Sequence, residues 1–130
     1  MLTNAKFQHL GFATPNIRAT VKFYTEALGF EVIHETATPD GLTPIVFIRN
    51  GAMTYEVYED KTLSAEAAKK PDHVAYDSTD IEADYKKAVE GGYTVTTNGI
   101  EGIPTVFDNG VRYFKIQGPS GEEIELCQIL

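Results

Sequence analysis

The pattern of apolar and polar positions predicts a strand, a helix and three further strands in the first part of the chain. Residues 6–14 alternate with the two-residue period of a strand. Apolar residues then recur at the spacing of one helix face, at Ile17, Val21, Tyr24 and Leu28. Gly29 is predicted to end that helix, because glycine readily adopts the left-handed conformation of a helix end. Strands are predicted over 30–38, 43–49 and 53–59, and Asn50-Gly51 marks a tight hairpin.

The same order of elements begins again after residue 70. A strand is predicted over 73–77, and Thr79-Asp80-Ile81-Glu82 has the Ser/Thr-x-x-Glu form of a capping box, which starts a helix. Gly91-Gly92 is predicted to end this second helix. Three further strands are predicted over 93–98, 111–117 and 122–129, with a loop over 99–104 and a turn over 118–121.

An internal repeat of this length predicts a duplicated structural unit. The expected fold is therefore α+β, with two tandem βαβββ modules that form curved mixed sheets. At 130 residues the chain is expected to form one domain, residues 1–130. The first module is assigned to residues 5–59 and the second to residues 71–130. The polar, Lys- and Glu-bearing segment 60–70 is interpreted as a linker that can be partly helical.

A histidine and a glutamate stand at matched places in the two modules. The first strand of each module reads x-x-His-apolar-small-aromatic-x-Ser/Thr, which aligns His9 with His73. Glu56 follows in the first module and Glu125 in the second, each between two apolar residues of a predicted strand. Because strand side chains alternate, all four polar side chains point away from their large apolar neighbours. If those apolar neighbours pack against the helices, the four residues face the opposite, concave side of the sheet.

Two imidazoles and two carboxylates form a donor set that suits a divalent first-row ion such as Zn, Ni, Co, Mn or Fe, and suits calcium poorly. Taken singly, a strand histidine is more often a hydrogen-bonded structural residue, and a strand glutamate more often faces water. Their recurrence in register favours ligation, because a duplicated solvent-facing pair would have no reason to stay in register. The pattern therefore predicts a metal site made by His9, Glu56, His73 and Glu125.

Composition limits the classes of partner. The net charge is −8, and the 11 Lys and Arg residues are scattered, which disfavours a nucleic-acid surface. The longest apolar runs fall well short of the roughly 20 residues that span a bilayer, and the N-terminus lacks a signal-peptide pattern. A single cysteine, Cys127, fits a reducing compartment. We therefore expect a soluble, cytoplasmic protein with a small-molecule substrate and neither nucleic acid nor membrane as a partner.

Two segments resemble the vicinal oxygen chelate superfamily, which has the glyoxalase-like fold. Asn16 to Phe30 is similar to that family's Asn-Ile-x(n)-Phe-Tyr-x-x-x-Leu-Gly-Phe helix. Gly118 to Leu126 is similar to its Asp-Pro-Asp-Gly-x-x-x-Glu-Leu signature, with Gly118 in place of the first Asp. The glutamate of that signature is the family's last metal ligand, which is Glu125 here. The resemblance covers nearly the whole chain and implies the same four ligands.

The full set of His, Glu, His and Glu resembles glyoxalase I (lactoylglutathione lyase). This resemblance implies a lyase or isomerase acting on a small α-hydroxycarbonyl compound or thiohemiacetal through an enediolate, with Glu125 or Glu56 as the base. The bacterial enzyme carries an Arg and an Asn for its thiol cofactor where Ala13 and Asp60 stand here. Whether glutathione or another thiol takes part therefore stays open.

Two other functions remain open at this point. One is a non-catalytic module that sequesters a small molecule. The other is an acyl-CoA epimerase, in which phosphates would be held by Arg112, Lys115 or the pair Lys69 and Lys70. A homodimer is expected, because each module has an open curved sheet whose concave face must be covered. The two modules of one chain can cover each other, or each can pair with a second chain.

Three further residues have simple interpretations. Tyr58 lies on the strand face of Glu56, where it lines the pocket or belongs to the core or rim. His34 has no matched partner in the repeat and is interpreted as a surface or hydrogen-bonding residue. Cys127 shares the face of Glu125 and is interpreted as a small buried thiol.

Overall fold

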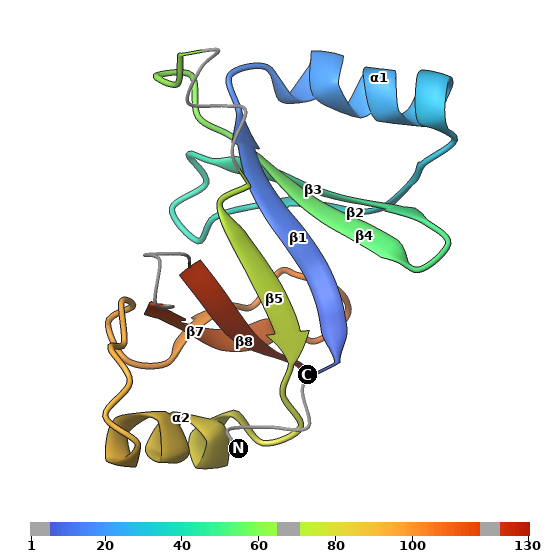
Figure 1. The fold of residues 1–130 in the computed structure, drawn as a ribbon. Coiled ribbons are helices and arrows are strands. Elements are labelled where there is room, and N and C mark those ends of the chain that lie inside the picture. The colour runs from blue at the N-terminus through green and yellow to red at the C-terminus, as the bar shows by residue number, and fades with distance from the viewer. Residues whose placement is uncertain (1–5, 65–70, 118–122) are drawn as a thin grey trace. The chain divides into compact units, whose positions relative to one another are not determined.

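The computed structural model describes residues 6–64, 71–117 and 123–130, apart from the side chain of Leu28 (Figure 1). Two expectations therefore lie outside the described residues: the conformation of linker residues 65–70 and the turn over 118–121. The chain divides into two compact units, residues 9–72, and residues 73–130 together with the segment up to Gln8. We describe the β1–β4 part as the first module and the β5–β8 part as the second module.

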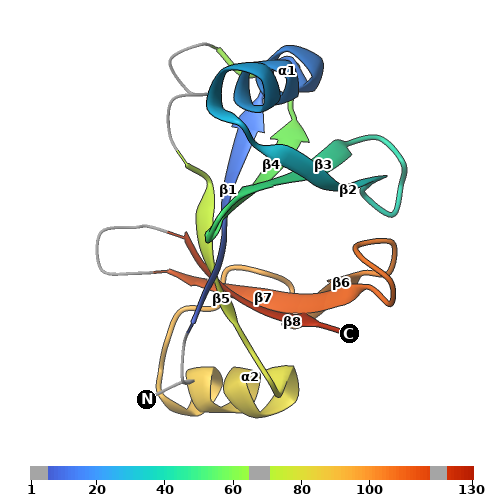
Figure 2. The ribbon, with the colours of Figure 1, turned by 90° about the vertical axis from the view of Figure 1, so that its right-hand side faces the viewer.

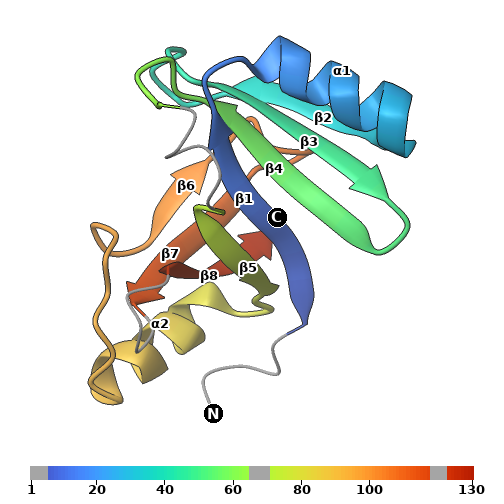
Figure 3. The same ribbon diagram turned by 45° about the horizontal axis from the view of Figure 1, so that its top comes forward.

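The first module has the predicted order of one strand, one helix and three strands. Its elements are β1 (Phe7–Thr14), α1 (Ile17–Leu28), β2 (Glu31–Ala37), β3 (Pro44–Asn50) and β4 (Met53–Glu59). The strands lie in the order β2-β3-β4-β1. β1 runs parallel to β4, whereas β3 is antiparallel to both of its neighbours. Figure 3 shows the β3–β4 hairpin. Its turn is Gly51-Ala52, one residue later than the predicted Asn50-Gly51, because Asn50 still pairs with Met53.

The second module repeats this arrangement. Its elements are β5 (His73–Asp77), α2 (Ile81–Glu90), β6 (Glu101–Ile103), β7 (Val111–Gln117) and β8 (Glu123–Ile129). The strand order is β5-β8-β7-β6, with β5 parallel to β8. The expected α+β fold of two βαβββ modules is thus confirmed. Along the described residues, no helix is both long and apolar enough to cross a membrane.

The prediction of a strand over 93–98 is wrong. In its place the chain makes one isolated bridge to β7, between Val95 and Ile116. The ladder stops there because the backbone N–H of Lys115 donates to the Thr97 hydroxyl at 3.1 Å. The chain turns at Gly99, whose φ of 68° lies in the region that favours glycine. The true edge strand, β6, forms inside the segment that was predicted to be a loop.

The start of α2 differs from the predicted capping box. The N-cap is Asp80, whose side chain accepts from the backbone N–H of Ala83 at 3.0 Å. Asn16 caps α1 in the same way, accepting from Ala19 at 3.0 Å. Aspartate and asparagine are among the strongest N-caps, so Asp80 can take this place although Thr79 begins a well-formed sequence motif.

This corrected cap gives a stability prediction. Asp80→Ala is expected to lower the free energy of unfolding by about 1 kcal/mol, because it removes the acceptor of a free helix amide. Thr79→Ala is the matched control and is expected to change stability by less than about 0.5 kcal/mol, since the Thr79 residue is exposed. Urea unfolding measures both. A larger loss for Thr79→Ala would restore the capping-box interpretation.

The start of each helix is also held by a second hydrogen bond, and this bond occurs in both modules. The backbone N–H of Ile17 donates to Glu59 Oε2 at 3.1 Å, and that of Ile81 donates to Gln128 Oε1 at 3.0 Å. Glu59 belongs to β4 and Gln128 to β8, the strands that run parallel to the first strand of their module. Each helix is therefore fixed to the strand that carries a candidate glutamate.

Each helix covers one face of its own strands (Figure 2). Under α1 the core of the first module includes Val46, Ile48 and Val57, with Phe12 and Tyr55 packed against it. Under α2 the core of the second module is formed by Ile81, Ala88, Phe114, Ile116 and Leu126. The large apolar residues beside the candidate ligands therefore face the helices. The predicted assignment of strand faces is confirmed in both modules.

Candidate metal-binding residues

His9 and Glu56 form a close pair in the first module. β1 and β4 are parallel, and Gly11 lies opposite Glu56, so His9 and Glu56 project from the same face. His9 Nε2 lies 3.6 Å from Glu56 Oε2, and the His9 side chain is only 2% exposed. Phe47, which lies opposite Glu56 on β3, contacts the His9 ring edge-on at 5.6 Å between centroids. The imidazole is thus held inside the protein, on the face away from α1.

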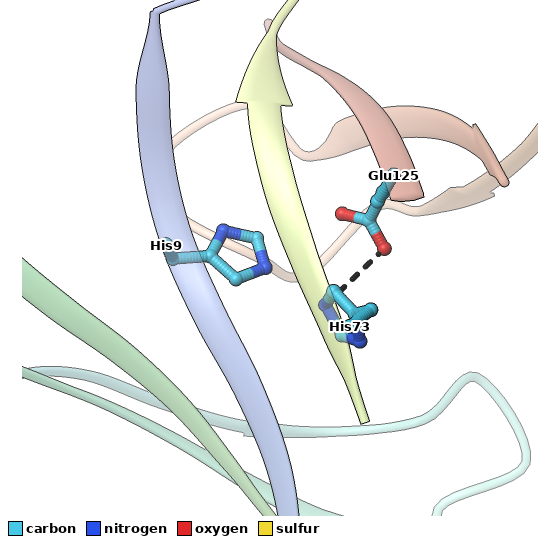
Figure 4. A group of neighbouring side chains, drawn as sticks. All are labelled: His9, His73 and Glu125. Carbon is cyan, nitrogen blue, oxygen red and sulfur yellow. Dashed lines mark ion pairs between the residues drawn. The ribbon is translucent and has the colours of Figure 1, made fainter. Parts of the chain in front are cut away.

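His73 and Glu125 repeat this pair in the second module. β5 and β8 are parallel, and Ala75 lies opposite Glu125, as Gly11 lies opposite Glu56. His73 Nε2 lies 3.4 Å from Glu125 Oε2, and both side chains are buried. Figure 4 shows this ion pair, together with His9 on its own strand. The sequence-predicted His–Glu pairs therefore come together within each module.

The separations within the two pairs fit a shared cation. Two ligand atoms that are each about 2.0–2.2 Å from one tetrahedral zinc ion lie about 3.3–3.6 Å from each other. The measured separations are 3.6 Å in the first pair and 3.4 Å in the second. Both exceed the usual length of a hydrogen bond between nitrogen and oxygen. The donor types and their spacing therefore suit each pair as two of the ligands of a divalent first-row ion.

Lys115 is a residue that the sequence prediction did not place at the site. It lies opposite Glu125 on β7, and its side chain is 20% exposed. Its Nζ lies 3.4 Å from His73 Nδ1 and 4.0 Å from Glu125 Oε2. From the sequence, Lys115 is expected only as a phosphate ligand of an acyl-CoA epimerase. The alternation of β7 could have shown its face, but its position opposite Glu125 depends on the register between β7 and β8.

Tyr58 lies on the same strand face as Glu56, two residues further along β4. Burial raises the pKa of its phenol, and a hydrogen bond with Asp72 and the nearby carboxylates of Glu56 and Asp60 raise that pKa further. The phenol therefore remains protonated at neutral pH, and its O–H donates to the Asp72 carboxylate. Asp72 is itself fixed to the first module, because its backbone N–H donates to the carbonyl of Gly11 at 2.6 Å.

His34 and Cys127 both lie at least partly inside the protein. His34 is half-buried on β2, opposite Phe47, with 6.4 Å between the ring centroids. This places it on the Glu56 face of the first module, closer to the candidate ligands than a simple surface residue would be. Cys127 is buried, as expected, and its backbone carbonyl accepts from Gln8 and from the amide of Ser78.

Comparisons with known proteins agree with this architecture. The protein YwbC of Bacillus subtilis (strain 168), itself uncharacterised, is 31% identical over 126 residues, which are 95% of this chain and 97% of YwbC. The structure of a hypothetical protein from Bacillus halodurans C-125 matches 98% of this chain and 96% of its own, with a TM-score of 0.78 and 20% identity.

Methylmalonyl-CoA epimerase from Mycobacterium tuberculosis has a similar structure. It matches 100% of this chain and 93% of its own, with a TM-score of 0.77 and 19% identity. At such identities the solved structures establish a likeness of fold alone. The family model described as Glyoxalase/Bleomycin resistance protein/Dioxygenase superfamily matches residues 6–126. This match spans both βαβββ modules and both His–Glu pairs, and the chain therefore belongs to that superfamily.

Proposed function

We propose that the protein is a metal-dependent lyase or isomerase of the glyoxalase I type, in which His9, Glu56, His73 and Glu125 together hold one divalent ion. The supporting observation is the duplicated His–Glu pair, with 3.6 Å in one module and 3.4 Å in the other. His9, His73 and Glu125 are buried, which is unusual for charged or titratable side chains that serve no further purpose. The joining of both pairs around a single ion is part of the proposal.

The chemistry follows from the donor set. The two His–Glu pairs would hold a divalent ion, which would polarise substrate oxygens and favour the loss of a proton from the adjacent carbon. Glu125 or Glu56 would remove that proton and return it at the neighbouring position, because a carboxylate can act as a general base. Tyr58, held protonated by its surroundings, lies on the Glu56 face with its hydroxyl hydrogen-bonded to Asp72. The substrate class is a small α-hydroxycarbonyl compound or a thiohemiacetal.

A second candidate is an epimerase for an acyl-CoA. It is favoured by the fold likeness to solved methylmalonyl-CoA epimerases. The residues named for phosphate binding support it less well. Arg112 is paired with Glu82 on α2, and Lys115 lies against His73 and Glu125. Lys69 and Lys70 lie outside the described residues.

A proton-exchange assay tests the proposed function. The metal-loaded protein is incubated in deuterium oxide with thiol adducts of an α-ketoaldehyde, and separately with methylmalonyl-CoA, and carbon-bound deuterium is followed by NMR. Exchange or turnover of the thiol adducts supports the lyase or isomerase. Exchange with the acyl-CoA alone would favour the epimerase. Tight binding of the adducts without exchange would favour a non-catalytic binding module.

A homodimer is the expected assembly, and sedimentation should give twice the chain mass. Mixing a His9→Ala protein with a His73→Ala protein then separates the two possible arrangements. If the four-ligand sites are shared between chains, about one quarter of wild-type turnover returns, because half of the dimers are mixed and each has one complete site. If each site is closed within one chain, no turnover returns. A monomer in sedimentation would contradict the prediction.

A further inference from the structure

The second His–Glu pair already has a cationic neighbour from the chain itself. Lys115 Nζ lies 3.4 Å from His73 Nδ1 and 4.0 Å from Glu125 Oε2. All three residues belong to the second module and lie on adjacent strands, with Lys115 directly opposite Glu125 in the register of β7 and β8. The side chains of His73 and Glu125 are almost fully buried, at 2% and 6% exposure. In such surroundings solvent screens the lysine charge only weakly.

The first module has an uncharged residue at the corresponding place. Phe47 lies opposite Glu56 on β3, as Lys115 lies opposite Glu125 on β7. Phe47 contacts the His9 ring edge-on, whereas Lys115 approaches the His73 ring with its ammonium group. The two pairs therefore share their backbone register but differ in the charge of the third neighbour.

Lysine also differs from phenylalanine in its hydrogen bonding. An ammonium group has three donors and no acceptor, so it can only donate to His73 Nδ1. A metal-ligating histidine normally donates its second ring N–H to an acceptor such as a carboxylate or a carbonyl. Lys115 approaches His73 Nδ1 as a donor and also brings a positive charge to within 4.0 Å of the Glu125 oxygen. Both properties oppose a second cation at His73 and Glu125.

We propose that Lys115 acts as an internal cation that competes with a divalent ion for His73 and Glu125 and so weakens metal binding. This inference rests on the proposed function, because it assumes that the two residues are ligands. It assigns Lys115 a role that the family resemblance does not supply: the ion must displace a built-in ammonium group as it binds. The second pair is then the half of the ligand set that limits metal affinity.

Metal affinity tests the inference without an activity assay. The dissociation constant for Zn²⁺ is measured by competition with a chromophoric chelator in the wild type, Lys115→Met and Lys115→Arg. Lys115→Met is expected to bind Zn²⁺ at least about tenfold more tightly, which corresponds to about 1.4 kcal/mol. Lys115→Arg keeps the charge and is expected to stay within about threefold of the wild type.

Lys86→Met is the matched control. Lys86 is 75% exposed on α2 and pairs with Glu90, so its loss changes the net charge equally but leaves the His–Glu pairs untouched. This variant is expected to bind Zn²⁺ like the wild type. If Lys115→Met fails to melt cooperatively, Lys115→Gln, which is neutral and polar, takes its place.

The outcomes separate the two proposals. Equal or weaker Zn²⁺ binding by Lys115→Met, when the wild type binds, would overturn the role of Lys115 and leave the metal site intact. An equal gain in Lys86→Met would also overturn it, because the effect would then come from net charge. Absence of binding in both the wild type and Lys115→Met would overturn the metal site and the role of Lys115 together.

Discussion

Glu125→Gln is expected to lower turnover by roughly 100- to 10,000-fold and to leave the fold intact. This range is the usual contribution of one general acid or base, and the loss of a metal ligand adds to it. Glutamine keeps the shape of glutamate but lacks the negative charge that can accept a proton from carbon. Glu125 lies on the face away from the second-module core, so the substitution leaves the packing under α2 unchanged. Steady-state kinetics and thermal melting measure the two effects.

Leu126→Ala is the matched comparison, because Leu126 is the next residue along β8 and points to the opposite face. It is 2% exposed and belongs to the core with Phe114 and Ile116. Its loss should lower the free energy of unfolding by roughly 2–5 kcal/mol, the cost of a buried leucine truncated to alanine. Turnover per folded molecule should change much less than in Glu125→Gln. The reverse ranking in stability and turnover would exclude Glu125 from the catalytic site.

Metal removal is expected to lower the melting temperature strongly. Protein purified without a chelator should contain about one divalent ion per complete set of four ligands. An ion present at 1,000 times its dissociation constant stabilises the folded state by about 4 kcal/mol. Because the chain has 130 residues, adding the ion to chelated protein should raise the melting temperature on the order of 10 °C. Differential scanning calorimetry and elemental analysis measure the shift and the stoichiometry.

Single-ligand variants provide the control for this shift. His9→Ala and His73→Ala should each lose most of the metal-dependent rise in melting temperature, because each removes one of the four ligands. Loss of the rise in His73→Ala alone would mean that the ion binds the second pair without the first. An unchanged melting temperature in the chelated wild type would contradict the proposed site.

The sequence predicted the repeat and the strand faces because both depend on local periodicity. His9, Glu56, His73 and Glu125 could be selected before the fold was known, since the two copies of the pattern align residue by residue. Alternation then separated each glutamate from its apolar neighbours, and the structure confirms this separation in both modules. Whether the four residues share one ion stays a prediction, because it depends on contacts between distant parts of the chain.

The features that the sequence did not predict depend on non-local contacts. The segment before Gly99 has the composition of a strand, but the Thr97 hydroxyl takes the amide of Lys115 and ends the ladder after one bridge. The position of Lys115 beside Glu125 depends on the β7–β8 register, which the alternation of β7 alone does not fix. Thr79 and Asp80 compete for the same helix start, and a sequence motif alone does not decide between two good caps.

The bonds from Glu59 and Gln128 to the helix starts have a consequence for hydrogen exchange. Each acceptor lies three residues beyond a candidate glutamate on the same strand, and each protects one backbone amide, that of Ile17 or Ile81. A strand that slips or frays near its glutamate would break the bond and expose that amide to solvent. Exchange rates at these two amides therefore report separately on the order of each glutamate-bearing strand, in solution and without a metal or a substrate.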